Sequence, residues 1–153
     1  MSKVQPWVPR ALGVLAGITL GLLAVQYLLG LWASAYAPAI FTTTPNTAAY
    51  AGHIALGYLV GVVALVMVIV AVLSKNPRPV AQALVILIAI GLAGIFGRMF
   101  VTTTPNDPIY SFGMGVMFLV AFGACIGLLW SAWKPTQGTS IKPPSEMSAG
   151  STA

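Results

Sequence analysis

Four long apolar runs, separated by short polar or proline-containing segments, set the pattern of this chain. They occupy residues 11–36, 50–73, 80–101 and 109–133. Each run reaches the roughly 20 residues that a helix needs to cross a hydrocarbon core of about 30 Å. Apolar and polar residues do not alternate along the runs, as they would in a membrane-spanning strand. A segment in lipid must satisfy its own backbone hydrogen bonds, so each run predicts a transmembrane helix.

The segment between the first two runs returns between the last two. Residues 42–46 read Thr-Thr-Thr-Pro-Asn, the same five residues stand at 102–106, and a tyrosine follows each copy (Tyr50 and Tyr110). We therefore predict an all-α integral membrane protein, a four-transmembrane-helix bundle made of two duplicated parallel hairpins. A pseudo-twofold axis along the membrane normal would relate the hairpins, as in the parallel repeats of some carriers.

The composition agrees with this fold class, since 58% of the residues are hydrophobic and 6% are charged, against roughly a quarter charged in soluble domains. We predict a cytoplasmic lead-in over residues 1–10 and a membrane domain over 11–133, with repeats at about 11–73 and 80–133. Residues 134–153 are rich in Pro, Ser, Thr and Gly, which predicts a disordered cytoplasmic tail.

The formal net charge of +5 is a topology signal. With four crossings, six of the seven Lys and Arg residues fall on the side of the two termini, namely Lys3, Arg10, Lys75, Arg78, Lys134 and Lys142. Cytoplasmic segments carry an excess of Lys and Arg. We therefore expect a multi-pass protein of the cell (plasma or inner) membrane, with both termini cytoplasmic and both Thr-Thr-Thr-Pro-Asn loops outside. The lipid bilayer is the expected partner of the chain, and no nucleic acid is expected.

The sequence also predicts where some helices end and where helices pack closely. Asp107 and Pro108 suit the cap and the first position of the last helix, and residues 75–79 predict a tight cytoplasmic turn because they contain two prolines. Gly13, Gly17 and Gly21 recur every four residues in the first run, which lets another helix approach closely. Packing within the bundle and docking onto other membrane subunits or a second copy both stay open.

A small cluster of polar residues is expected in the outer part of the bundle. Gln26 lies near mid-membrane, and the residues nearer the outer face are Tyr50, His53, Arg98, Asp107 and Tyr110. Polar and ionisable groups within a membrane are costly and mark functional sites by default. Gln26 should face protein and find a hydrogen bond. Arg98 either pairs with Asp107 or reaches the outer headgroups, or else clamps an anionic group such as a haem propionate, a lipid phosphate or a substrate carboxylate.

His53, the single histidine, has two possible roles. It is either a hydrogen-bonded interfacial side chain or an axial ligand of haem, since neutral imidazole binds iron and Gly57 would leave room for the macrocycle. One histidine cannot supply two axial ligands, so Met114, or His53 of a second chain, would complete the site unless the haem is five-coordinate. The candidate cofactor-binding residues are thus His53, Arg98 and Met114, and haem b is the candidate cofactor.

The segment Tyr-Ala-Gly-His-Ile-Ala-Leu-Gly-Tyr-Leu-Val-Gly, residues 50–61, resembles the second helix of small four-helix membrane proteins of the haem-b and haem A synthase kind. The resemblance implies that His53 is a haem ligand near the outer end of its helix. It covers about a dozen residues, and this chain departs from the family by lacking a partner histidine in its fourth helix.

Hydrolytic or phosphoryl-transfer catalysis is not expected, because no cluster of ligands, nucleophile–base pair or phosphate loop stands in the sequence. The lone Cys125 is expected to be a buried helix residue. Three function classes stay open: a non-catalytic subunit of a larger membrane complex, a haem- or quinone-linked electron-transfer protein, and a small carrier or channel. A carrier needs a polar path, and the deep membrane offers little beyond Thr19 and Gln26.

Overall fold

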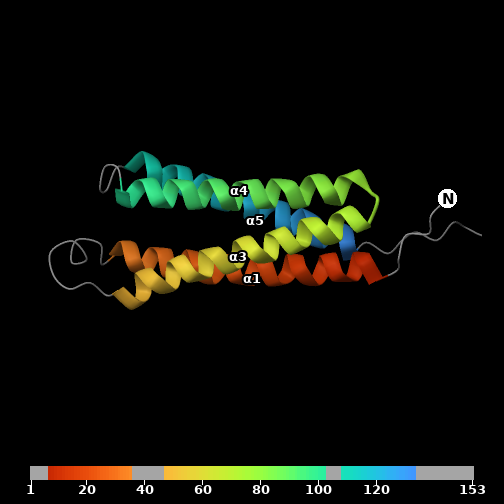
Figure 1. Ribbon diagram of the computed structural model, residues 1–153, viewed down its shortest axis with the longest axis horizontal. Coiled ribbons are helices and arrows are strands. Elements are labelled where there is room, and N and C mark those ends of the chain that lie inside the picture. Colours follow the sequence, from red (N-terminus) through yellow and green to blue (C-terminus); the bar gives the residue numbers. More distant parts are fainter. Residues whose placement is uncertain (1–6, 36–46, 103–107, 134–153) are drawn as a thin grey trace, which may run out of the picture.

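The computed structural model describes residues 7–35, 47–102 and 108–133, and it is all-helical over these ranges, without a strand (Figure 1). The elements are α1 (Trp7–Ala35), α3 (Thr47–Leu73), α4 (Pro77–Thr102) and α5 (Pro108–Trp133). The expected all-α architecture is confirmed for the described part of the chain.

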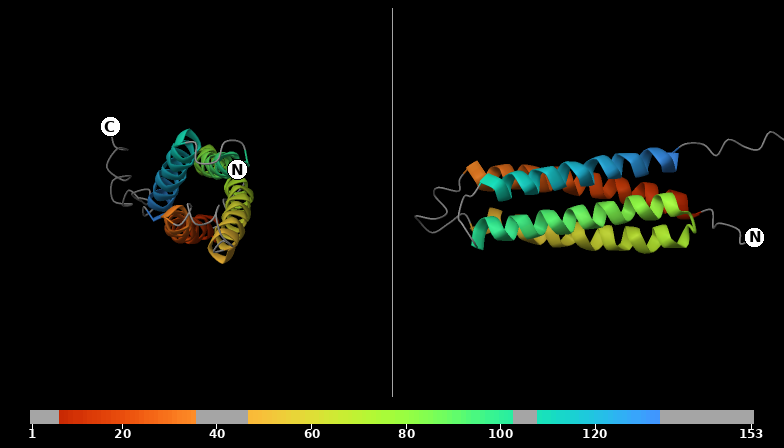
Figure 2. Two further views of the ribbon diagram at one scale, coloured as in Figure 1. Left: turned by 90° about the vertical axis from the view of Figure 1, so that its left-hand side faces the viewer. Right: turned by 90° about the horizontal axis from the view of Figure 1, so that it is seen from above.

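The four helices stand side by side in a ring when the bundle is viewed along its length (Figure 2). Around this ring α1 contacts α3 and α5, and α4 contacts the same two helices. Consecutive helices run in opposite directions. The start of α1, the turn from α3 to α4 and the end of α5 therefore lie together at one end of the bundle (Figure 1). We call this the basic end, after Arg10, Lys75 and Arg78, and the opposite end the loop end.

Each of the four helices is long and apolar enough to cross a membrane. Their outward surfaces are also apolar: side chains such as Val62, Ile69, Ile88 and Leu119 are exposed on α3, α4 and α5. A helix in water keeps a polar face opposite its buried stripe, whereas a membrane helix is apolar all round. The described helices therefore fit a multi-pass membrane bundle.

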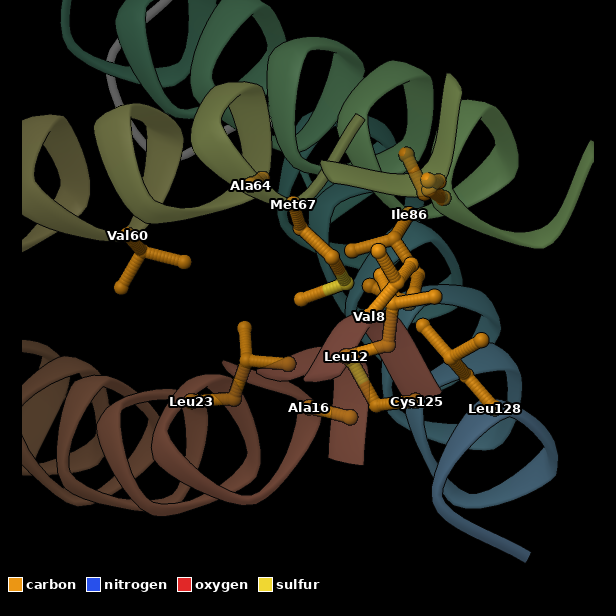
Figure 3. Packing of buried hydrophobic residues seen from close by; sticks show 14 residues of the cluster. Val8, Leu12, Ala16, Leu23, Val60, Ala64, Met67, Ile86, Cys125 and Leu128 are labelled. Atoms are coloured by element: carbon orange, nitrogen blue, oxygen red, sulfur yellow. The ribbon is translucent and has the colours of Figure 1, made fainter. Parts of the chain in front are cut away.

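Most of the buried hydrophobic side chains lie in the half of the bundle near the basic end. Met67 and Ile86 are fully buried there, and Figure 3 shows their side chains meeting Val8 and Leu12 between the helices. Alanines with no exposed surface, such as Ala64, line the same contacts and let the helix backbones approach. Small residues serve this purpose in lipid, where no hydrophobic force drives helices together.

Cys125 and Thr19 are buried near this core. Cys125 is free and fully buried, which confirms the prediction of a packed helix residue. Thr19 is also fully buried, and its hydroxyl donates to the carbonyl of Leu15 at 2.8 Å. Its hydrogen bond is thus made within its own helix.

Three helices begin earlier than the apolar runs suggested. α1 begins at Trp7, α3 at Thr47 and α4 at Pro77, whereas the runs begin at residues 11, 50 and 80. The first N–H groups of a helix have no intrahelical partner, so the first turn accepts proline and polar residues that an apolar run leaves out. α5 begins at Pro108, as predicted, while Asp107 lies outside the described residues.

The turn between α3 and α4 is closed by side-chain hydrogen bonds. The Ser74 hydroxyl donates to the carbonyl of Ala71 at 2.6 Å, and Asn76 Oδ1 accepts from the backbone N–H of Arg78 at 3.1 Å. Asn76 is thereby the N-cap of α4, with Pro77 at the first helical position. Lys75, which lies between Ser74 and Asn76, has a φ of 54°, the left-handed conformation common just after a helix.

Candidate functional site

Gln26 of α1 and His53 of α3 meet between their helices in the half of the bundle near the loop end. The amide Nε2 of Gln26 donates to the backbone carbonyl of His53 at 3.0 Å and lies 3.2 Å from the ring Nε2 of His53. An amide NH2 group has two hydrogens to donate. It therefore serves both contacts when Nε2 of His53 is the acceptor, which assigns the ring proton to Nδ1. The hydrogen bond expected of Gln26 is present.

Each of these two side chains lies against a glycine of the facing helix. A Cβ atom added to Gly57 would lie 3.3 Å from Nε2 of Gln26, and one added to Gly30 would lie 3.1 Å from Cε1 of His53. Residues four apart share a helix face, so Gln26 and Gly30 stand together on α1 while His53 and Gly57 stand together on α3. The antiparallel pairing then sets each polar side chain opposite a glycine. We call these four residues the Gln26–His53 clasp.

Two polar atoms of the Gln26–His53 clasp form no hydrogen bond with the described residues. Oε1 of Gln26 and Nδ1 of His53 are buried and have no hydrogen-bond partner among the described residues. A buried polar group without a partner costs about 1–3 kcal/mol. The clasp therefore joins α1 to α3 through one donor group while one acceptor and one ring nitrogen stay unbonded.

A haem does not fit the clasp as it is arranged. The amide of Gln26 lies beside Gly57, where the macrocycle was expected, and the haem site itself stays a prediction. The ring Nε2 of His53 faces the same amide. Met114 belongs to the other hairpin, where its Sδ atom lies 3.4 Å from the position of a Cβ on Gly97 of α4. Within the described ranges no three His, Cys, Asp or Glu side chains gather as metal ligands do.

The other residues expected near the outer face are not part of the clasp. Arg98 is exposed, and its backbone carbonyl accepts a hydrogen bond from the Thr102 hydroxyl at 2.9 Å. Tyr50 is exposed and Tyr110 is half-buried. Asp107 lies outside the described residues, so its pairing with Arg98 stays a prediction.

Side chains set against glycines also join the second hairpin, and the sequence pattern did not single them out. Nε2 of Gln82 in α4 lies 3.1 Å from the position of a Cβ on Gly127, and the ring of Phe96 lies 3.1 Å from that on Gly113. A glycine shows in a sequence, but periodicity along one helix does not say which residue of the facing helix lies over it. The one signal in the sequence for the Gln82 contact is a single glutamine in the third apolar run, followed by a fourth run that is rich in glycine.

The three evenly spaced glycines of α1, Gly13, Gly17 and Gly21, divide between two environments. A Cβ on Gly13 would lie 3.3 Å from Cβ of Ala132 in α5, so this position is an internal helix contact. Gly17 and Gly21 are exposed, with nothing within 4 Å of an added Cβ. Four-residue steps rotate by about 40° around a helix of 3.6 residues per turn, which carries the later glycines away from α5.

No protein-family model, curated protein or solved structure matches this chain. The resemblance of the segment around His53 to haem-b and haem A synthase proteins thus stays a prediction.

Proposed function

We propose that this protein is a non-catalytic, accessory subunit of a larger membrane complex. It crosses the plasma or inner membrane four times, with both termini and the α3–α4 turn in the cytoplasm and the Thr-Thr-Thr-Pro-Asn loops outside. The positions of Arg10, Lys75 and Arg78 support this orientation, because Lys and Arg accumulate on the cytoplasmic side. Trp7 and Trp133 are exposed at the same end, where tryptophan rings settle at the headgroups.

The exposed glycines on the outer face of α4 are the main support for a subunit role. Gly91 and Gly94 are exposed on this face, with nothing within 4 Å of an added Cβ at either position. α4 is also the helix with the least internal cover: 11% of its most apolar stretch is buried, against 28% for α1. Glycine in a membrane helix exposes backbone that a second helix can approach closely. The α4 face is therefore available for docking.

The polar side chains support a structural role more than a catalytic one. Gln26 bonds to His53, Thr19 bonds within α1, and Ser131 donates to the carbonyl of Leu128 at 2.8 Å. Polar groups in lipid commonly join or stiffen helices in this way. A carrier would need such groups to line a water-filled path, whereas these groups are engaged within the bundle.

Electron transfer through haem loses its geometric support, because the clasp fills the space beside His53. An absorption spectrum of gently solubilised protein, oxidised and then reduced with dithionite, tests this directly. We expect no Soret band that depends on His53. A band lost in His53→Ala but kept in Cys125→Ala would contradict the proposal and restore haem as the function.

Co-purification from native membranes tests the docking face. The tagged wild-type chain is cross-linked, purified and analysed by mass spectrometry beside Gly91→Leu/Gly94→Leu and a control, Gly115→Leu. Gly115 of α5 is equally exposed and open. Overpacking a helix contact by about 1–3 kcal/mol predicts roughly a tenfold loss of partners in the double variant. The control should keep them.

No atom of the described residues lies within 4 Å of a Cβ added at Gly91, Gly94 or Gly115, so all three proteins should unfold at similar temperatures in detergent. A wild-type chain that purifies as a stable monomer with no membrane protein attached would contradict the subunit role. Equal loss of partners in the double variant and the control would contradict the assignment of the docking face to α4.

A further inference from the structure

A groove opens between α1 and α5 at the basic end, on the outside of the bundle. Its volume is about 610 Å³, within the range of about 300–1,000 Å³ typical of ligand sites. The lining is almost wholly apolar and consists of Pro9, Arg10, Gly13, Val14, Gly17, Ile18, Leu129, Ala132 and Trp133. The groove lies on another side of the molecule from Gly91 and Gly94 of α4, so it is independent of the proposed docking face.

The depth of the groove comes from two glycines of α1. Gly13 is buried against Ala132 of α5, while Gly17, one turn further along, is exposed and has nothing within 4 Å of an added Cβ. Val14 and Ile18 are exposed beside them. The groove is thus an apolar channel with bare backbone as its floor.

The mouth of the groove is polar and carries a positive charge. Arg10, in the first turns of α1, is exposed, and the indole of Trp133 lies across the groove with its Nε1 3.6 Å from the position of a Cβ on Gly13. The chain has two acidic residues, Asp107 and Glu146, and neither lies in the described part. Among the described residues, then, the Arg10 guanidinium has no carboxylate partner.

We propose that this groove binds an anionic glycerophospholipid. Its phosphate lies at Arg10 and one acyl chain lies along Gly13 and Gly17. Basic pockets between transmembrane helices on the cytoplasmic side bind anionic headgroups, and guanidinium forms strong, charge-assisted hydrogen bonds with phosphate. An acyl chain gains no hydrophobic energy on moving from bulk lipid into the groove. Selectivity therefore comes from the headgroup charge, and residence in the groove comes from its shape.

Native mass spectrometry of protein released from nanodiscs tests the site. The nanodiscs contain equal amounts of phosphatidylglycerol and phosphatidylcholine, and the retained lipids are counted on each protein. We expect wild type to retain phosphatidylglycerol preferentially. In Arg10→Gln the ratio of retained phosphatidylglycerol to phosphatidylcholine should fall about fivefold, which is the contribution of one Lys or Arg near anionic lipid. Arg10→Lys should recover most of it.

Two matched controls separate the groove from general effects of charge and bulk. Arg78→Gln removes an exposed cation at the same end but outside the groove, and Gly21→Leu adds bulk to an exposed, open glycine one turn beyond Gly17. Both should retain lipid as wild type does. Gly17→Leu places a side chain in the groove at a position where an added Cβ has no described atom within 4 Å, and it should lose the retained lipid.

Three results would overturn the proposal. Equal losses in Arg10→Gln and Arg78→Gln would assign the preference to diffuse surface charge. Unchanged lipid retention in Gly17→Leu would place the lipid elsewhere. A Gly17→Leu protein that keeps its lipid but loses a bound polypeptide would make the groove a helix-docking surface.

Discussion

Gln26 is the residue whose behaviour in the bundle follows most directly from physical chemistry. An amide that faces lipid has no partner, so it must turn towards protein, and it donates to His53 on the neighbouring helix. The need for a partner could be predicted from the sequence. Its identity could not, because the apolar pattern of α1 does not fix which turn of α3 lies opposite.

A double-mutant cycle measures the clasp. Gln26→Ala and His53→Ala should each destabilise the bundle. The two effects should couple by about 0.6 kcal/mol, the average for hydrogen-bonded pairs in a membrane protein, and by at most about 1.7 kcal/mol. Reversible unfolding in mixed micelles provides the free energies. Gln82→Ala serves as control: it removes an amide lying over Gly127 of the other hairpin and should be additive with His53→Ala. Additivity of the Gln26 and His53 changes would show that the two side chains do not interact.

At the scale of the elements, helix pairs are joined by side chains set against glycines. In the first hairpin Gln26 and His53 lie over Gly57 and Gly30, and in the second hairpin Phe96 lies over Gly113. The sequence predicted glycine-mediated contacts but not which glycines lie inside. That division depends on how each helix is rotated about its axis, which a run that is apolar on every side does not specify.

The α1–α3 contact gives a matched pair of substitutions on α3. Gly57→Leu should destabilise the bundle by about 1–3 kcal/mol because the new side chain meets the Gln26 amide. At Gly61, one turn further along, an added Cβ has no described atom within 4 Å, so Gly61→Leu should be close to neutral. Thermal unfolding in detergent compares the two. A larger loss at Gly61 would mean that α1 and α3 are rotated differently from the arrangement described.

The α3–α4 turn offers a test of the cap. Asn76→Ala removes the oxygen that accepts from the Arg78 N–H and should cost about 1 kcal/mol, as for other helix N-caps. Asn76→Asp keeps an acceptor in the same place and should retain most of the stability. Unfolding free energies of the three proteins provide the comparison, and equal losses in both variants would contradict the capping role.

At the scale of the whole molecule, length and apolarity were sufficient to predict four helices in an up-and-down bundle. They could not locate the core, which gathers around Met67 and Ile86 near the basic end, because every run is apolar throughout. Nor could they predict that the clasp closes the space beside His53, since that depends on a contact between two helices. The duplication of the hairpins and the orientation of the termini rest on the repeated loops and the basic residues of the sequence.

Side-specific labelling tests the four-span topology most directly. In a Cys125→Ala background, Thr44→Cys, Asn76→Cys and Thr104→Cys are exposed in turn to a membrane-impermeant maleimide. The account predicts that Thr44→Cys and Thr104→Cys react in intact cells, whereas Asn76→Cys reacts only after the membrane is permeabilised. Labelling of Asn76→Cys together with the two loop positions in intact cells would contradict a bundle of two parallel hairpins that cross the membrane four times.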